Sequence, residues 1–334
     1  MKKRYDGRQT VILILSAFAI AYFCCTTDNS DNPDHMSSLP EHAKRYGIYV
    51  FDPASGETSL VYSSENSIHR IHENPEGTRL VFCEYFGSDV FHHSEICIIN
   101  TDGSGFKRVT ENTWLDSYPS WSPDGSRILY LSWPDYPQNT MDIFVMNAEG
   151  AGAVELYDSG FHDADCHWVD SRIVFTRESQ IWIMDDDGSN ARQVTHDERA
   201  GEDGAGLPFG DYDPRLNPAG TMICFDRMVD DQNPSGNWNF YLVYPDGTEE
   251  RAITNTGWQQ FMAEWSHTGN RILFTVAAMN GEGLYDLYMM NADGSDLSEI
   301  TPSNWPALFL CSHGIFSHDD SKIYFVGEWW EQGT

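Results

Sequence analysis

Acidic, aromatic and amide side chains recur at matched positions along this chain, mostly in pairs that lie two residues apart. The first members of successive sets are separated by 47, 48 and 49 residues: Asp116 with Tyr118, Asp163 with Asp165, Asp211 with Asp213, and then Gln260. Carboxylate oxygens bind hard cations such as Ca²⁺, and an acidic depression with an aromatic edge also suits a cationic peptide segment. The same carboxylates could instead accept backbone N–H bonds inside the fold, and the sequence leaves both interpretations open.

Three histidines lie near the same positions of their repeats and could hold a divalent metal such as Ca²⁺ or Mn²⁺: His72, His167 and His313. A neutral imidazole is a common metal ligand, but it is also a common buried side chain with a hydrogen-bond partner. No Cys-x-x-Cys pair occurs, so a cysteine zinc site has no support. We therefore expect no cofactor, with a histidine metal site as the alternative.

Motifs for covalent or zinc-dependent hydrolysis are absent from the sequence. There is no Gly-x-Ser-x-Gly nucleophile elbow and no His-Glu-x-x-His pair. The acidic run at 185–190 lacks the spaced ligands and the closing Glu of a calcium loop, and we interpret it as a turn. These absences predict a protein that is not an enzyme.

The elements that carry these residues are copies of one unit, seen most fully in residues 118–157. Strands at 118–121 and 127–131 flank a Pro-Asp-Gly turn, and a second pair follows at 142–147 and 153–157. The residues that open each second strand recur at intervals of 48, 45, 50, 49 and 51: Arg79, Arg127, Arg172, Met222, Arg271 and Lys322. This period, with four antiparallel strands per unit, is typical of a β-propeller.

The sixth copy is divided between the two ends of the chain. Residues 309–333 supply its first two strands, and residues 47–52 and 58–62 supply the third and fourth. Pairing the two ends closes the ring and removes the sheet edges that an open array would expose. We therefore predict an all-β fold over residues 47–334, a six-bladed propeller of four-stranded antiparallel blades.

The copies resemble the TolB-type propeller repeat, in which an apolar-x-Trp-Ser-Pro-Asp-Gly run precedes one strand and Asn-x-Asp-Gly ends another. Residues 121–125 match the first pattern, and residues 100–103 and 291–294 match the second. The resemblance covers residues 47–334 and implies the propeller fold. It implies little about function, because the matching residues are turn and core positions.

The architecture is also similar to that of oligogalacturonate lyases, which hold a divalent metal in the channel with several histidines and a glutamine. Two of those histidines lie one residue apart, whereas residues 312–315 keep only His313, and Leu310 stands near the place of the glutamine. This resemblance implies His72, His167 and His313 as the remaining ligands. The alternative to a binding protein is therefore a metal-dependent carbohydrate-active enzyme.

The N-terminus carries the features of a secretory signal. Basic residues precede a run of thirteen residues at 11–23 that is mostly apolar and too short to span a bilayer. Cys24 and Cys25 follow, which resembles a bacterial lipoprotein signal, with simple secretion as the alternative. We predict a signal at 1–25, lipidation at Cys24 or Cys25, a flexible tether at 26–46, and an extracytoplasmic location in the periplasm, at the outer membrane or at the cell surface.

Charge narrows the range of partners. Acidic residues outnumber basic ones by 51 to 20, which gives a net charge of −31. Phosphate contacts need clustered Lys and Arg, so nucleic acid is not an expected partner. We expect a monomer that contacts the membrane only through its lipid anchor and binds a protein or peptide of the cell envelope.

The expected binding face is the one that carries the long connections between strands. Antiparallel order puts the tight turns of every blade on one face of the ring and the longer loops on the other. The longer loops carry Trp114, Trp258 and Trp305, and exposed aromatic residues often mark a recognition surface. We expect these residues and the acidic positions named above to surround the channel mouth, although some could instead fill gaps between blades.

Overall fold

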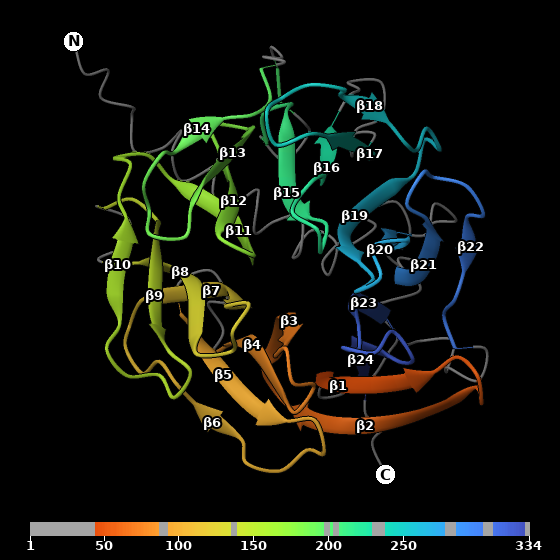
Figure 1. Ribbon diagram of the computed structural model, residues 1–334. Helices are drawn as coiled ribbons and strands as arrows, with labels where there is room; N and C mark the ends of the chain where they lie inside the picture. Colours follow the sequence, from red (N-terminus) through yellow and green to blue (C-terminus); the bar gives the residue numbers. More distant parts are fainter. Residues whose placement is uncertain are drawn as a thin grey trace.

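The computed structural model describes residues 44–86, 93–134, 139–196, 201–202, 207–228, 238–277, 285–302 and 310–330. The regular elements in these residues are β-strands, which form six four-stranded antiparallel blades around a central axis (Figure 1). No helix in these ranges is long and apolar enough to cross a membrane. The prediction of a six-bladed, all-β propeller is confirmed.

The strands of blades 1 to 3 follow one another from the axis to the rim. Blade 1 contains β3 (Ser67–Glu73), β4 (Arg79–Tyr85), β5 (Ser94–Asn100) and β6 (Lys107–Arg108). Blade 2 contains β7 (Leu115–Trp121), β8 (Arg127–Trp133), β9 (Asp142–Asn147) and β10 (Val154–Tyr157). Blade 3 contains β11 (Asp163–Val169), β12 (Arg172–Arg177), β13 (Gln180–Asp185) and β14 (Arg192–Gln193).

Blades 4 and 5 repeat this order. Blade 4 contains β15 (Asp211–Leu216), β16 (Ile223–Met228), β17 (Trp238–Val243) and β18 (Arg251–Ala252). Blade 5 contains β19 (Gln259–Trp265), β20 (Arg271–Ala277), β21 (Tyr285–Asn291) and β22 (Ser298–Glu299). A single parallel bridge between Ser94 and Leu115 joins blades 1 and 2 into one eight-stranded sheet.

Blade 6 closes the ring with strands from both ends of the described chain, as the sequence predicts. Its order from rim to axis is β2 (Glu57–Ser64), β1 (Lys44–Asp52), β24 (Ile323–Trp330) and β23 (Leu310–Phe316). Ile48 pairs with Val326 at the seam between the two ends. β1 begins at Lys44, three residues before the expected start at 47, because residues 44–46 continue the ladder with residues 328–330.

Large apolar side chains and cation–π contacts fill the spaces between blades. Trp121, Trp168 and Trp265 are buried. The guanidinium of Arg79 in blade 1 lies over the ring of Trp121 in blade 2, and Arg127 of blade 2 lies over Trp168 of blade 3 in the same way. The residues that open successive second strands therefore help to join each blade to the next.

The cysteines act as small buried side chains in this core. The five described residues of this type are free and buried: Cys83, Cys97, Cys166, Cys224 and Cys311. Cys83 pairs across the ladder with Ile96, and Cys97 with Phe82, so the two are not cross-strand neighbours. Burial raises the pKa of the Cys83 thiol to about 12, which keeps this group protonated and unreactive.

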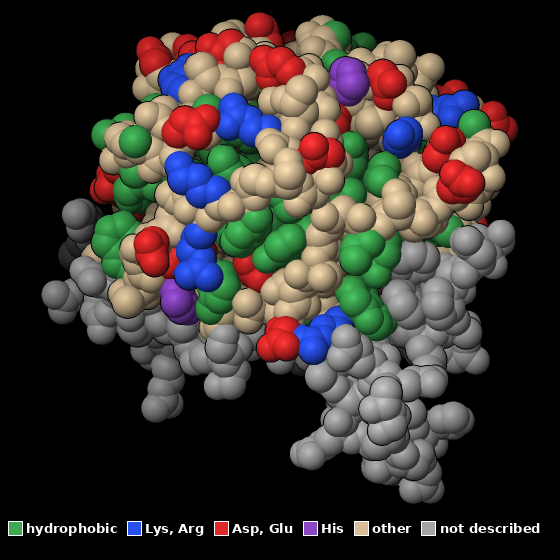
Figure 2. Space-filling view, turned by 90° about the horizontal axis from the view of Figure 1, so that it is seen from below, with side chains coloured by type: hydrophobic (Ala, Val, Ile, Leu, Met, Phe, Trp, Pro, Cys, Tyr) green, Lys and Arg blue, Asp and Glu red, His purple; other side chains and the backbone are tan. Residues whose placement is uncertain are grey.

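The rim differs from blade to blade. The outermost strands β6, β14, β18 and β22 have two residues each, β10 has four and β2 has eight. Leu60 of β2 is 51% exposed, and Tyr62 of the same strand stacks on Phe106 of blade 1 with ring centroids 5.0 Å apart. Figure 2 views the rim on this side and shows hydrophobic side chains with Lys and Arg beside them.

Candidate functional site in the central channel

The innermost strand of each blade contains one bulge, and the same position in every bulge has a left-handed backbone. The register of each inner strand shifts there, as between Ser117 and Ser120 of β7. The six residues have φ between 50° and 61°: Arg70, Tyr118, Asp165, Asp213, Met262 and His313. A left-handed conformation costs a non-glycine residue about 1 to 2 kcal/mol, so the fold must impose it. We call these six residues the bulge ring.

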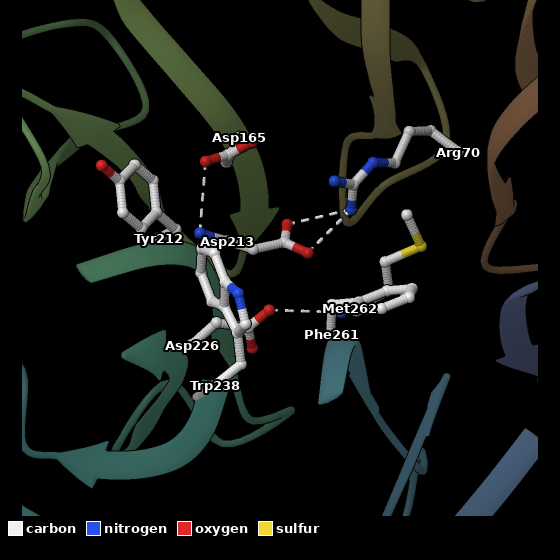
Figure 3. A pocket seen from close by; sticks show the side chains of 8 residues that line it. All are labelled: Arg70, Asp165, Tyr212, Asp213, Asp226, Trp238, Phe261 and Met262. Carbon is white, nitrogen blue, oxygen red and sulfur yellow. Dashed lines mark hydrogen bonds and ion pairs between the residues drawn. The ribbon is translucent and has the colours of Figure 1, made fainter. Parts of the chain in front are cut away.

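Arg70 braces the bulge ring across the channel. Its Nη1 donates to both carboxylate oxygens of Asp213, each at 2.9 Å, and its Nη2 donates to the hydroxyl of Tyr118 at 2.9 Å. The guanidinium carbon also lies 4.2 Å from the centre of the Tyr118 ring. Arg70 belongs to blade 1 and Asp213 to blade 4, on the opposite side of the ring (Figures 1 and 3). One side chain therefore joins three blades and fills the axis.

A second layer of polar side chains continues along the channel, two residues further on in the inner strands of blades 1, 3, 4 and 5. Arg215 donates to Asp213 at 3.0 Å and to Glu264 at 3.3 Å. The rings of His72 and His167 lie 5.9 Å apart in an edge-to-face arrangement. Burial, followed by the charge of Arg215, lowers the pKa of His72 to about 3 and that of His167 well below its usual value. Both histidines are therefore neutral at physiological pH.

Three carboxyl groups lie near the guanidinium of Arg70 and differ in their hydrogen bonds: those of Asp165, Asp213 and Asp226. Asp165 accepts from the backbone N–H of Asp213 at 3.2 Å, and Asp226 accepts from the N–H of Met262 at 3.3 Å through Oδ2. The other oxygen of Asp226, Oδ1, is buried without a hydrogen-bond partner. Burial and the charge of Asp213 raise the pKa of Asp226 and of Asp165. Although burial opposes it, Arg215 and Arg70 lower the pKa of Asp213 and keep it ionised.

These groups enclose a small cavity of about 10 Å³, which is room for roughly one water molecule. Its lining combines charged, aromatic and sulfur-containing side chains: Arg70, Asp165, Tyr212, Asp213, Asp226, Trp238, Phe261 and Met262 (Figure 3). Trp238 opens β17, and Asp213 is the third residue of β15. The cavity therefore lies just inside the face that carries the long connections.

The sequence predicts that both members of each pair, two residues apart, lie at the channel mouth. The structure places only the second member of each pair in the bulge ring. Tyr118, Asp165 and Asp213 belong to the bulge ring, as their spacing predicts. The residues two positions earlier are fully buried and bond within or beside their own blade: Asp116, Asp163, Asp211 and Gln260. Because each bulge adds one residue to the strand, it reverses the alternation of faces that our count assumed. A partner cannot reach these four without a rearrangement.

The partners of these four residues explain their burial. Asp163 accepts from Nε of Arg177 at 2.7 Å, and the carboxylate of Asp211 accepts two bonds from Arg227, at 2.5 and 2.8 Å. Asp116 accepts from the hydroxyl of Ser132 at 2.5 Å, while burial raises the pKa of its carboxyl to about 6. Gln260 donates to Thr256 and to the carbonyl of Trp238. These contacts stabilise the blades internally.

The predicted tryptophans occupy different surroundings. Trp114 is half-buried in the loop before β7. Trp258 is also half-buried, and it packs on the core of blade 5 with its ring 5.5 Å from that of Tyr288. Trp305, Cys24 and Cys25 lie outside the described residues. Their predicted roles stay predictions.

The three candidate metal histidines do not form one site. His313 packs edge-to-face on His69 with ring centroids 5.0 Å apart, whereas His72 and His167 pair with each other. His72 also accepts a hydrogen bond from the backbone N–H of Trp121 at 3.1 Å. Within the described ranges, no group of three or more His, Cys, Asp or Glu side chains is arranged to hold a metal ion. These histidines therefore do not fit the lyase-like site.

Two features of the channel escape the sequence reasoning. Arg70 stands out as the one basic residue of the bulge ring, but its reach to Asp213 depends on the ring being closed. Asp226 lies four residues after the opening of its second strand. The matching positions of the other blades hold no charged residue: Cys83, Leu131, Thr176, Thr275 and Val326. A carboxylate in an otherwise apolar or small-polar position was the available signal.

Comparisons with known proteins agree with the fold. No family model matches the sequence. An uncharacterized protein of Agrobacterium fabrum is 28% identical over 142 residues, which are 40% of this chain and 43% of that protein, so the chain spans less than half of the curated relative it matches. The similarity at this level does not establish a family.

Solved structures share the architecture at low sequence identity. A TolB-type protein from Agrobacterium tumefaciens has a TM-score of 0.63 and 14% identity, covering 87% of this chain and 99% of that one. TolB from Acinetobacter baumannii has a TM-score of 0.58 and 15% identity, covering 78% and 64%. An oligogalacturonate lyase from Vibrio parahaemolyticus has a TM-score of 0.50 and 12% identity, covering 86% and 98%. The chain is therefore a β-propeller with a TolB-like fold.

Proposed function

We propose that this chain is a non-catalytic, extracytoplasmic propeller that binds a protein or peptide of the cell envelope through the face of its long connections. The proposal rests on the contacts that Arg70 makes across the central channel. Arg70 fixes blades 1, 2 and 4 to one another, and the cavity beside it holds about one water molecule. This cavity has no room for a sugar ring, which favours a rigid scaffold over a lyase.

The described part of the long-connection face offers a partner aromatic side chains in the connections from blade 1 to blade 2 and from blade 2 to blade 3. Phe161 is 43% exposed in the loop between β10 and β11, and Trp114 is half-buried in the loop that leads into β7. Large aromatic residues on rigid supports are the usual anchors of protein interfaces. We take Trp114 and Phe161 as the first contacts to test, with Trp258 and Trp305 as further candidates.

The location follows from the N-terminal sequence. The signal at 1–25, lipidation at Cys24 or Cys25 and a tether at 26–46 would hold a monomeric propeller beside a membrane, in the periplasm or at the cell surface. TolB-like folds among the solved structures support this proposal without deciding it. The acidic surface, with a net charge of −31, favours a partner with basic segments.

The test compares the long-connection face with the rim. The mature chain is immobilised, exposed to envelope extract from its own host, and the retained proteins are quantified by mass spectrometry. Replacing Trp114 and Phe161 together by Ala should reduce the captured partner at least about tenfold, because truncated aromatic anchors cost 1.4 kcal/mol or more. The matched control is Leu60→Ala, since Leu60 is a large hydrophobic residue that is 51% exposed on the rim.

Two outcomes would contradict this proposal. Equal capture by both variants would show that the aromatic loops do not form the interface. Cleavage of acidic oligosaccharides by the purified protein, lost on removal of Mn²⁺ or Ca²⁺, would favour the carbohydrate-active alternative instead.

A further inference from the structure

The carboxyl groups around the cavity beside Arg70 outnumber the guanidinium groups that lie against them. Four carboxyl groups surround the cavity or its immediate neighbours, and two guanidinium groups, those of Arg70 and Arg215, lie against them. The carboxyl groups are those of Asp165, Asp213, Asp226 and Glu264. When all four are ionised, the cluster carries two more negative charges than positive ones.

The ion pairs of Arg70 and Arg215 go to Asp213 and Glu264, and of the other two carboxyl groups Asp226 is the one with a buried oxygen that has no hydrogen-bond partner. Its side chain is 2% exposed and lines the cavity, and Oδ1 has no hydrogen-bond partner. A buried acceptor without a partner costs about 1 to 3 kcal/mol, and a charged one costs more. Asp226 lines the cavity, so a small rotation of its carboxyl group would let a donor there bond to Oδ1 and remove that cost. The free oxygen therefore points to a small ligand that donates a hydrogen bond and carries positive charge.

The residues that line the cavity favour an ammonium group over a divalent metal ion. Tyr212, Trp238 and Phe261 contribute aromatic rings, and Met262 contributes a thioether. Aromatic faces attract ammonium groups through the ring quadrupole, whereas Ca²⁺ and Mg²⁺ require six or more oxygen ligands. Arg70 already takes both oxygens of Asp213, which leaves too few for a hard divalent ion. The space for about one water molecule matches an –NH₃⁺ group, which has similar size.

We propose that this cavity binds a primary ammonium group, with Oδ1 of Asp226 as its main acceptor. We further infer that this group is the end of a lysine side chain, or the chain N-terminus, of the bound partner. This step rests on the proposed function. Asp213 and Met262 lie two and three residues inside their strands, a depth of about 7 to 10 Å at about 3.3 Å per residue. The long stem of a lysine suits an approach of this kind.

Ammonium binding should be coupled to proton release. Asp226 faces Asp213 and Arg215 of β15, Arg70 of β3 and the N–H of Met262 on β19, and it shares the cavity lining with Asp165 of β11. Burial and Asp213 raise its pKa, which favours the neutral carboxyl when no cation is bound. An ammonium group favours the ionised form, so binding expels the proton. Affinity should therefore increase as the pH rises toward the pKa of the vacant site.

The first experiment uses inorganic ammonium as the probe, with the full mature chain. Thermal unfolding is followed in NH₄Cl and in KCl at the same concentration, because K⁺ has similar size and charge but donates no hydrogen bond. We expect Tm to be higher in NH₄Cl by roughly 2 °C or more once the concentration exceeds the dissociation constant. ¹⁵N-labelled ammonium should also give a bound signal whose protons exchange slowly with water.

The variant Asp226→Asn tests the assigned acceptor. It should fold, because burial already favours a neutral side chain at this position and the amide oxygen can still accept from the N–H of Met262. It should lose both the Tm difference and the bound ammonium signal. The matched control is Asp246→Asn, in an exposed outer turn where the carboxylate accepts from Thr248, and it should keep both.

A second probe separates the two sources of the ammonium group. n-Butylammonium carries the stem of a lysine, so a Tm gain with this probe that Asp226→Asn abolishes would support a partner side chain. A gain with NH₄Cl alone would overturn the lysine assignment. Partner capture that Asp226→Asn leaves intact, while the Trp114 and Phe161 variant loses it, would also overturn that assignment and leave the proposed function standing. Equal Tm values in NH₄Cl, KCl and NaCl, or a larger gain with CaCl₂, would overturn the ammonium site itself.

Discussion

Arg70 is the residue on which the geometry of the channel depends most. Its guanidinium is nearly buried and satisfies a carboxylate on the opposite blade and a tyrosine on the adjacent one. Arg is suited to this role because its planar fork binds a carboxylate through two hydrogen bonds and stacks on aromatic rings. The brace therefore combines charge, hydrogen bonding and cation–π contact in one side chain.

Removing the brace should destabilise the protein strongly. Arg70→Met keeps most of the volume but leaves Asp213 with only Arg215 as a cationic partner, so we expect a loss of about 3 kcal/mol in the free energy of unfolding. The double variant Arg70→Met with Asp213→Asn should recover part of that loss, because residue 213 then no longer carries a buried charge that has lost its main partner. Urea denaturation of the two single variants and the double variant measures the coupling.

The control for this cycle is Arg79→Met, which removes a more exposed ion pair with Glu149 and a cation–π contact with Trp121 of the next blade. A pair of this kind contributes about 0 to 1 kcal/mol. Similar losses at Arg70 and Arg79, or strictly additive losses at Arg70 and Asp213, would contradict this prediction. They would show that the contact between Arg70 and Asp213 stabilises the fold no more than an exposed ion pair does.

Residue spacing alone predicts only part of the channel. The period of the repeat places Tyr118, Asp165 and Asp213 correctly at the axis. It fails for Asp116 and Asp163, because the bulge inserted after them changes the face on which they lie. A bulge has no strong mark in the sequence here, since the residues at its centre range from Arg to Met. Side-chain direction near the axis therefore cannot be read from alternation.

Among the elements, the turn between the third and fourth strands of a blade has a specific role in closing the ring. Its glycine lies against the backbone of the preceding blade: a Cβ at Gly294 would be 2.1 Å from the carbonyl oxygen of Ile253, and one at Gly103 would be 2.6 Å from that of Val61. Both glycines also have positive φ. The recurring Asp-Gly turn thus allows adjacent blades to approach closely, which explains why it recurs in the sequence.

Gly294→Ala tests whether this turn needs glycine only for its positive φ or also for its close contact with the preceding blade. The Ala must adopt φ of +89° and also displace the carbonyl of Ile253, so we expect a loss of about 2 to 3 kcal/mol. The matched control is Gly56→Ala in the corresponding turn of blade 6, where φ is +75° and nothing lies within 4 Å of the added Cβ. That variant should lose only about 1 kcal/mol. Equal losses in urea denaturation would show that blade contact at the turn is unimportant.

The strands themselves differ in how well the sequence predicts them. The second strands β8 and β20 are buried on both faces and appear as apolar runs between turn residues. The outermost strands β14 and β22 are exposed and only two residues long, so they leave no periodic pattern. Their positions follow from the turn before them and not from their own residues.

For the whole molecule, ring closure is the feature that the sequence predicts best. Two half blades at opposite ends of a repeat array can satisfy their edges only by pairing with each other, and β1 and β24 do so along eight residue pairs. The channel cavity was less predictable, because its lining comes from four blades and depends on where they converge. Closure can be inferred from a count of strands, whereas a cavity requires the positions of side chains.

The charge of the whole molecule should make its stability depend on ionic strength. A chain with a net charge of −31 repels itself across the folded surface, and raising ionic strength from about 0.01 to 0.1 M shortens the Debye length from about 30 to 10 Å. We expect Tm at pH 8 to rise by roughly 3 °C or more over this range. NaCl and sodium thiocyanate should have similar effects, because screening depends on ionic strength and not on the identity of the anion. The gain should shrink at pH 5, where more carboxyl groups are neutral. A fall in Tm with salt would mean that attractive pairs such as Arg227 with Asp211 and Glu250 outweigh the net repulsion.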